Sequence, residues 1–318
     1  MAPFKRYVPW AIACGLIVII VGGYYALFAA PTLFSPGSIV RITYGTSVSE
    51  IATELADAHI IAHPLLLRTI LRLTGESNNV QTGVYKFETP QNVFVVAYRL
   101  VTGAYDLPPV RITFVEGTTV REAALHVGQA FPYISAKDFL LQAQGQEGYL
   151  FPDTYFFQPG VDAKSIVARM RSNFDTKIAP LLAEIKTGGH SLSDTVVMAS
   201  LIEKEARTSA DREMVAGILW NRIGRGMPLQ VDAVFGYIYN RDTYSPSLAD
   251  LKINSPYNTY IHTGLPPGPI DNPGLVSLEA ALHPTQTKYL YYLTDRNGVM
   301  HYATTYAEHQ ANLRKYLK

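Results

Sequence analysis

We predict an α+β fold for this chain, preceded by a helix that spans a membrane. Three observations lead to this prediction: a long apolar run near the N-terminus, two strand-like runs that each lead into a helix start, and several helical patterns in the C-terminal third. With 318 residues, the chain is also long enough for two domains.

The N-terminal segment has the character of a membrane anchor. No charged residue occurs from residue 7 to residue 39, and a helix needs about 20 apolar residues to cross a bilayer core. A cleaved signal peptide is the alternative, but its apolar region is usually only about 7–15 residues long. We therefore expect a single-pass helix over 8–30. Lys5 and Arg6 predict that the tail, 1–7, is cytoplasmic and that the rest of the chain lies outside the cytoplasm.

A short linker, 31–39, is followed by two similar stretches of sequence. "VRITYGTSVSEIATEL" begins at Val40 and "VRITFVEGTTVREAAL" begins at Val110, and each combines a strand-like run, a glycine turn and a helix start. The two helix starts share the spacing of a capping box, Ser47 with Glu50 and Thr119 with Glu122. The stretches are either generic strand–helix units or a pair of related modules. We place a membrane-proximal module at 40–107 and a larger domain at 108–318.

Composition and missing motifs exclude several classes of function. The formal net charge of +1 argues against a nucleic-acid-binding protein. The single cysteine, Cys14, rules out an intramolecular disulfide and a thiolate metal cluster. The eight histidines show no metal-ligand spacing, and the phosphate-loop, dinucleotide-binding, zinc-protease and serine-hydrolase motifs are all missing from the sequence. We expect no metal and no cofactor.

The stretch "ASLIEKEART" places two glutamates at the end of an apolar helix. At about 100° per residue, Glu205 continues the apolar stripe formed by Leu201 and Ile202. Glu203 points about 200° away, beside Arg207, where we expect an ordinary surface ion pair. A carboxyl group on a buried face loses solvation, which raises its pKa and suits it to act as a general acid. The alternative is that the helix has ended and Glu205 only caps it or pairs with an arginine.

A polar and aromatic passage follows these glutamates. Gln230 and Asp232 share one face if "MPLQVDAVFGY" is extended. Tyr257, Asn258 and Tyr260 lie in "NSPYNTYIHTGLPPGPIDNPG", where prolines reduce the entropy of the free loop. Tyrosine rings and amides in a rigid groove suit a neutral, hydroxyl-rich polymer, because rings contact apolar sugar surfaces and amides bond hydroxyl groups. The alternative is an ordered loop that only covers the core.

Several of these segments resemble those of a known family. "MASLIEKEA", "GMPLQVDAVFGY", "SPYNTYIHTGLPPGPIDNPG", "SLEAALHP" and "YLYYL" occur in the same order as in the YceG-like endolytic murein transglycosylases, the MltG group. "GYLFPDTYFF" matches the upstream signature of that family. The resemblance covers nearly the whole chain. Val231 and Ala233 stand where we expect a threonine and a proline, which leaves the fine substrate preference open.

The resemblance implies a LysM-like module at 40–107 and a mixed α/β catalytic domain at 108–318 with a helical core like that of lytic transglycosylases. It implies an enzyme anchored in the cell membrane that cuts the β-1,4 bond between N-acetylmuramic acid and N-acetylglucosamine of peptidoglycan and leaves 1,6-anhydro ends. Such enzymes are thought to terminate nascent strands near the cell-wall synthases. The catalytic glutamate of the family corresponds to Glu205. The substrate groove would contain Gln230, Asp232, Tyr257, Asn258 and Tyr260.

Two other functions compete with this one. A hydrolytic muramidase would use Asp232 as the second carboxylate beside Glu205, because ordinary glycosidases need two. A lytic transglycosylase needs only one, because the C6 hydroxyl group of the sugar itself attacks the reacting carbon. A non-catalytic scaffold would bind glycan through 40–107, recruit a synthase and release no product.

Overall fold

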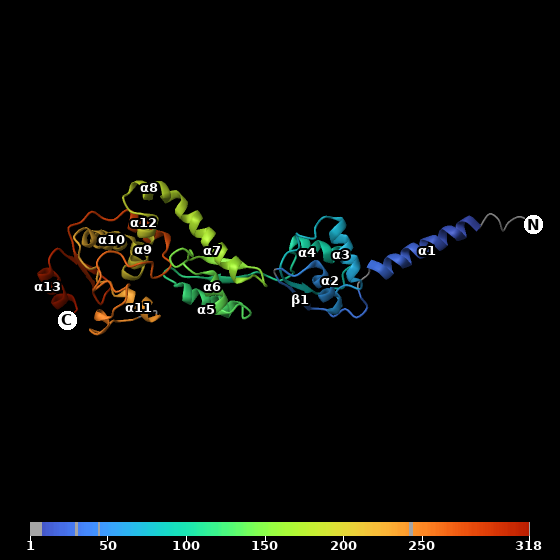
Figure 1. The fold of residues 1–318 in the computed structure, drawn as a ribbon, viewed down its shortest axis with the longest axis horizontal. Coiled ribbons are helices and arrows are strands. Elements are labelled where there is room, and N and C mark those ends of the chain that lie inside the picture. Colours follow the sequence, from blue (N-terminus) through green and yellow to red (C-terminus); the bar gives the residue numbers. More distant parts are fainter. Residues whose placement is uncertain (1–7, 29–30, 44, 242–243, 318) are drawn as a thin grey trace, which may run out of the picture. The chain divides into compact units, whose positions relative to one another are not determined.

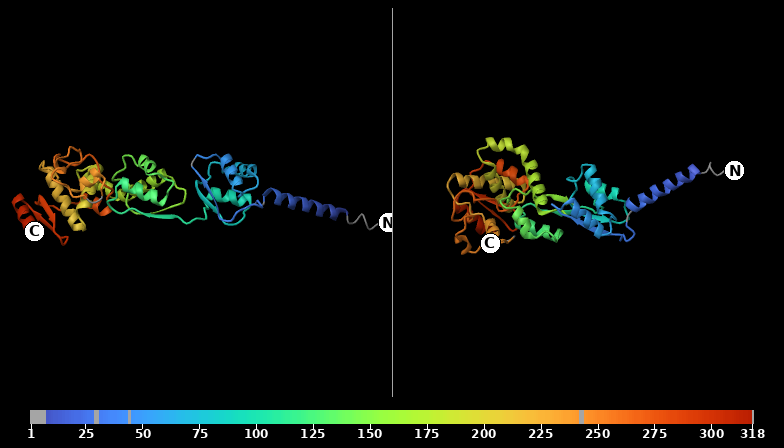
Figure 2. Two further views of the ribbon diagram at one scale, coloured as in Figure 1. Left: turned by 90° about the horizontal axis from the view of Figure 1, so that it is seen from below. Right: turned by 45° about the vertical axis from the view of Figure 1, so that its right-hand side comes forward.

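The chain is a mixture of helices and two-stranded sheets, which confirms the predicted α+β fold class. This computed structural model describes residues 8–28, 31–43, 45–241 and 244–317, and Figures 1 and 2 show their secondary structure. The chain divides into two compact units. Unit 1 comprises the residues up to Val110 together with Phe156–Val161, and unit 2 comprises Arg111–Tyr155 and Asp162–Lys318.

Unit 1 has a core of its own, built from one antiparallel sheet and three helices. Its elements are α1 (Val8–Phe28), β1 (Ser38–Ile42), α2 (Val48–Asp57), α3 (Pro64–Leu73), β2 (Gly83–Phe87) and α4 (Val93–Thr102). β1 pairs with β2 so that Val40 lies opposite Tyr85. The core buries Tyr85 together with Leu55 and Leu67 from α2 and α3. α2 begins with the predicted capping box of Ser47 and Glu50.

The apolar helix α1 carries no charged residue, and large side chains such as Ile12, Leu16 and Ile19 are exposed along it. Within the described part of the chain, none of the helices combines the length and the apolar character that crossing a membrane requires. The predicted single-pass helix at 8–30 is therefore not confirmed. The predicted cytoplasmic tail, 1–7, lies outside the described residues.

Unit 2 is mainly helical, and two short strands near its end form a hairpin. Its helices are α5 (Val120–Ala130), α6 (Ala136–Gln142), α7 (Ala163–Ile178), α8 (Leu182–Thr187), α9 (Leu192–Glu205), α10 (Ser209–Gly224), α11 (Ala233–Tyr239), α12 (Leu275–Leu282) and α13 (Tyr306–Tyr316). β5 (Tyr291–Thr294) and β6 (Met300–Ala303) pair antiparallel. β3 (Val110–Thr113) and β4 (Thr154–Phe157) form another two-stranded sheet. α5 begins with the predicted capping box of Thr119 and Glu122.

Helix α9 lies at the centre of unit 2. It packs against α8, α10, α11 and α12, and every residue from Thr195 to Ile202 is buried. Ser191 caps its first turn and accepts a hydrogen bond from the backbone N–H of Asp194. Because a helix that is buried all round has no free polar face, the side chains at its C-terminal end must find partners inside the fold.

Candidate active site

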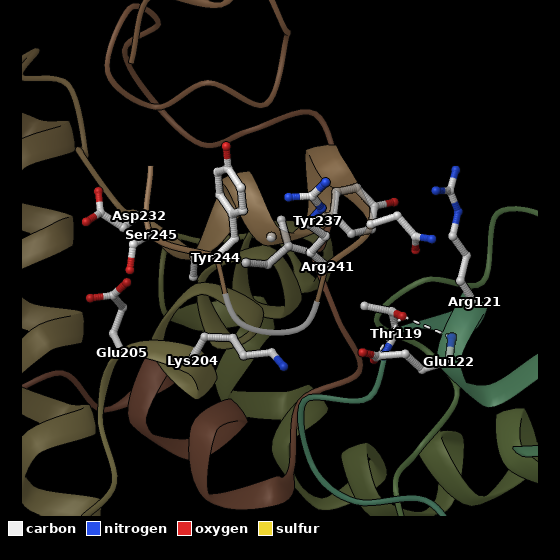
Figure 3. Close-up of a pocket in the computed structure, with 14 residues that line it drawn as sticks. Thr119, Arg121, Glu122, Lys204, Glu205, Asp232, Tyr237, Arg241, Tyr244 and Ser245 are labelled. Atoms are coloured by element: carbon white, nitrogen blue, oxygen red, sulfur yellow. Dashed lines mark hydrogen bonds between the residues drawn. The ribbon is translucent and has the colours of Figure 1, made fainter. Parts of the chain in front are cut away.

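A cavity of about 610 Å³ lies in unit 2 beside the C-terminal end of α9 (Figure 3). Ligand sites commonly have volumes of about 300–1,000 Å³. The walls come from the start of α5 (Thr119, Arg121, Glu122), the end of α9 (Lys204, Glu205), α11 with its flanking loops (Asp232, Ala233, Gly236, Tyr237, Asn240, Arg241, Tyr244, Ser245) and Ile270. Segments that are far apart in the sequence therefore meet around one space.

Glu205, the last residue of α9, places its carboxyl group in the wall of this cavity. The helix ends there because the next residue, Ala206, has an extended backbone. The carboxylate oxygen Oε2 accepts a hydrogen bond of 2.9 Å from the hydroxyl group of Tyr292 in β5. Burial raises the pKa of Glu205 to about 7, and the nearby Asp232 carboxylate raises it too, against the hydrogen bonds from Tyr292 and from the backbone of Ala233. Glu205 is thus able to hold a proton at neutral pH and to release it.

Asp232 lies in the same wall, immediately before α11. Its Oδ1 accepts a hydrogen bond of 2.5 Å from the hydroxyl group of Tyr260. Burial raises the pKa of Tyr260, and the hydrogen bond to Asp232 adds to the rise, so the phenol remains a donor. The structure therefore brings three of the predicted site residues, Glu205, Asp232 and Tyr260, to one place.

The predicted site residue Gln230 has a different environment. Its backbone adopts a positive φ of 55°, and its N–H donates to the carbonyl oxygen of Thr259. Its side-chain oxygen accepts a hydrogen bond from Arg222, which is buried and also donates to the carbonyl oxygen of Leu229. Among the described residues that line the cavity, Gln230 is not included. Its visible role is to hold the segment that leads into Asp232.

Tyr257 and Asn258 are not among the described residues that line the cavity. Asn258 is fully buried, and its amide nitrogen donates to the carbonyl oxygens of Leu251 and Ile253. Its amide oxygen accepts from the backbone N–H of Tyr260. The ring of Tyr257 packs against that of Tyr237, with centroids 5.0 Å apart. The side chain of Asn258 therefore forms its hydrogen bonds within the loop. Tyr257 positions Tyr237, which lines the cavity.

The predicted environment of Glu203 is wrong. Its side chain is only 5% exposed and pairs with Arg212 at 2.6 Å, not with Arg207 on the surface. Its second oxygen accepts a hydrogen bond from the backbone N–H of Gly274. The helical wheel assumed one buried face, whereas α9 is enclosed by other helices. Glu203 thus joins α9 to α10 and to the start of α12.

Several cavity residues were not identified from the sequence. Tyr292, which bonds Glu205, lies within the quoted "YLYYL" segment, but nothing in that run distinguishes one tyrosine from the next. Arg121, Lys204 and Arg241 give the cavity three cationic side chains. The described residues contain no group of three or more His, Cys, Asp or Glu side chains that could hold a metal ion.

Comparisons with known proteins show what this chain is similar to. A model of the YceG-like family matches residues 40–315. The chain is 32% identical over 305 residues to an endolytic murein transglycosylase of Bacillus subtilis (strain 168), covering 87% of this chain and 84% of that protein. It is 28% identical to an endolytic murein transglycosylase of Streptococcus pneumoniae serotype 2 (strain D39 / NCTC 7466), covering 87% of this chain but only 58% of the longer relative. A crystal structure of a yceG-like protein from Listeria monocytogenes matches with a TM-score of 0.61 and 29% identity, covering 86% of this chain and 97% of that one.

Proposed function

The chain belongs to the YceG-like family, and from this membership we propose that it is an endolytic lytic transglycosylase of peptidoglycan. One observation carries the proposal: Glu205, a carboxyl group with a pKa of about 7, lines a cavity large enough for a ligand. The reaction separates N-acetylmuramic acid from N-acetylglucosamine and leaves a 1,6-anhydro end on the muramic acid. We further propose that it terminates nascent strands during cell-wall assembly.

Glu205 serves first as the acid and then as the base. Its proton moves to the bridging oxygen O4 while the bond between that oxygen and C1 of the muramic acid breaks. The C6 hydroxyl group of the same sugar attacks C1, a bond forms between C1 and O6, and the hydroxyl proton passes to Glu205. The carboxyl group ends as it began, and no water enters the product. A single group does both tasks best when its pKa lies near the working pH, and a pKa of about 7 suits Glu205 to both tasks at neutral pH.

The neighbours of Glu205 support both steps. Tyr292 donates a hydrogen bond to the carboxylate form and so stabilises the charge that appears when the proton leaves. Asp232, oriented by Tyr260, supplies a negative charge where positive charge develops on the sugar ring. Gln230, Tyr257 and Asn258 hold the loops that carry these groups, rather than touching the sugar.

A hydrolytic muramidase is the second candidate, and the position of Asp232 favours it. Asp232 lines the same cavity as Glu205, and its charge raises the pKa of Glu205. In an inverting glycosidase, the second carboxylate activates a water molecule that attacks the sugar. The products differ by one water, because hydrolysis adds a water that the anhydro product lacks.

Mass spectrometry of the product ends tests the proposal. We expect the wild-type chain to release fragments with 1,6-anhydro ends from peptidoglycan, and Glu205→Gln to lose at least about a hundredfold in rate, the usual contribution of a general acid. Glu279→Gln is the matched control, because Glu279 is exposed on α12 and is not among the described residues that line the cavity. Hydrated ends would favour the muramidase, and full activity of Glu205→Gln would exclude Glu205 as the catalyst.

We also propose where the protein acts. Exposed apolar side chains along α1, preceded in the sequence by Lys5 and Arg6, support attachment to the cell membrane with the N-terminus in the cytoplasm. The catalytic domain at 108–318 would then face peptidoglycan outside the membrane, close to the cell-wall synthases. In this proposal, 40–107 is a LysM-like module that positions the domain on the glycan.

A further inference from the structure

The cavity has a cationic end as well as a carboxylate end. In Figure 3, Glu205 and Asp232 lie on one side of the cavity and Arg121 lies on the other, with Lys204, Tyr237 and Arg241 between them. The cationic residues come from three separate segments: the first turn of α5, the end of α9 and the loop after α11. The proposed acid–base reaction uses none of them.

Arg121 and Arg241 are available to a ligand. Both residues are exposed, and within the described part of the chain neither forms an ion pair. Arg241 lies over the ring of Tyr244, with its guanidinium carbon 5.7 Å from the ring centre, and this contact orients its planar group. Arg121 follows Thr119, the N-cap of α5, so the positive end of that helix adds to its charge.

The carboxyl groups around Arg121 only partly offset this positive charge. Glu122 is held by the capping box, where its Oε2 accepts hydrogen bonds from the backbone and hydroxyl group of Thr119. Glu147 accepts a hydrogen bond from the backbone of Val120, and burial raises its pKa to about 7. Glu147 therefore carries less negative charge at neutral pH than an exposed carboxyl group does. Counted together, Arg121, Lys204 and Arg241 outnumber Glu122 and the partly charged Glu147, so this part of the cavity keeps a surplus of positive charge.

We propose that Arg121 and Arg241 bind a carboxylate of the peptides that the glycan strand carries. The inference rests on the proposed function. The sugar rings of peptidoglycan are uncharged and need no cations, whereas guanidinium groups match carboxylates in charge and in planar geometry. The peptides are attached to the lactyl group of muramic acid, which is the sugar at the cleaved bond. When the bond to be cleaved is at Glu205, the attached peptide lies close to the same cavity. Arg121 and Arg241 line this cavity and can bind a carboxylate of that peptide. The enzyme then prefers peptide-bearing strands to bare glycan.

The test compares the full-length protein on two polymers, peptidoglycan with its peptides and the same glycan after an amidase has removed them. Both are first freed of phosphate-bearing polymers, so that the peptides are the only anionic substituents that differ. The quantity measured is the ratio of kcat/KM on the two polymers. We expect wild type to prefer the peptide-bearing polymer, and we expect Arg121→Gln and Arg241→Gln each to lower the ratio about tenfold, as for a lost hydrogen bond to a charged group.

Controls separate this role from others. Arg225→Gln removes the same charge from an exposed residue outside the cavity lining, and it should leave the ratio at the wild-type value. Arg121→Lys keeps the positive charge but lacks the planar pair of N–H donors of a guanidinium group, so it should give a ratio of kcat/KM between those of wild type and Arg121→Gln. Equal losses on both polymers, or a wild-type ratio of one, would overturn the peptide subsite. Failure of wild type to cut either polymer would instead overturn the proposed function.

Discussion

Glu203 and Glu205 lie two residues apart at the end of one helix, yet their carboxyl groups have opposite surroundings. Glu203 pairs with Arg212 and accepts a hydrogen bond from the backbone N–H of Gly274, and these two contacts fix its side chain. Glu205 has Tyr292 and Asp232 as neighbours, and burial with a nearby negative charge favours its protonated form. The difference between a structural carboxylate and a proposed acid is therefore made by the partners that the fold supplies.

The pH dependence of the reaction should follow from Glu205. Because the acid must be protonated, kcat/KM should fall above pH 7 by about tenfold for each pH unit. The Tyr292 hydroxyl group lowers the pKa of Glu205 by bonding its charged form, so Tyr292→Phe should raise that pKa and move the decline to higher pH. A pH profile of kcat/KM for each protein measures this shift.

The control for this profile is Tyr306→Phe, which removes a hydroxyl group from an exposed residue of α13. Its decline should coincide with that of wild type. If Tyr292→Phe also declines at the wild-type pH, Tyr292 does not tune the acid.

The sequence predicted the buried position of Glu205 but not the surroundings of Glu203, and the difference has a physical reason. The position of Glu205 follows from helical phase, which is a local property of the chain. The direction of Glu203 does not, because it depends on which helices enclose α9. Tyr292 lies 87 residues further along the chain than Glu205, and only the folded hairpin of β5 and β6 brings it there.

At the scale of elements, α9 holds the site together because hydrogen bonds connect it to α10, to the start of α12 and to the cavity wall. Glu203 connects it to α10 through Arg212 and to the start of α12 through Gly274. The hydroxyl group of Ser200, also buried in α9, accepts from the backbone N–H of Ile270, a residue of the cavity wall. Displacing α9 would therefore displace the walls as well as Glu205.

Glu203→Gln should lower stability without removing the chemistry. The amide leaves Arg212 without its close charged partner in a place where only 11% of that side chain is exposed. We expect a loss of about 2 kcal/mol in the free energy of unfolding. Denaturant unfolding measures this loss. The cleavage rate per folded molecule should stay within about threefold of wild type, because we expect the pKa of Glu205 to change by less than one unit, and a full unit would change the rate about tenfold.

The exposed Glu279→Gln again serves as the comparison and should leave the free energy of unfolding unchanged within about 0.5 kcal/mol. A Glu203→Gln protein that is fully stable but inactive would reverse the roles assigned to the two glutamates.

For the long passage at 240–274, the sequence predicted an ordered loop but not the direction in which its side chains point. Its prolines and aromatic residues predicted an ordered loop, and the buried amide of Asn258 holds it together. The same composition suggested that Asn258 faces the ligand. An amide serves equally well in either role, and only the positions of the carbonyl groups of Leu251 and Ile253 decide between them.

At the scale of the whole molecule, the fold class was predictable because helix and strand patterns are local. The cavity was not, because residues near 120, 205, 232 and 270 have to meet before it exists. Nothing in the sequence distinguishes Arg121, Lys204 and Arg241 from ordinary surface charges. Only the folded structure shows that they line the same cavity.

Membrane attachment is a property of the whole chain that a simple deletion tests. Removing residues 1–30 takes away the exposed apolar side chains of α1. We expect the full chain in the membrane fraction of a cell lysate and the shortened chain in the supernatant after centrifugation. The full-length Glu205→Gln protein should remain with the membranes, because that change leaves α1 intact. A full chain found in the supernatant would contradict attachment.

Asn272 has a consequence for the order in which the protein folds. Its buried side chain donates to the carbonyl oxygen of Thr118, 154 residues earlier, and accepts from the backbone N–H of Leu150. Loops of such length close slowly, because entropy must be lost before the contacts form. The wall that contains the start of α5 is thus completed only after the C-terminal third of the chain has emerged. A chain still in synthesis therefore contains Glu205 before its cavity is complete.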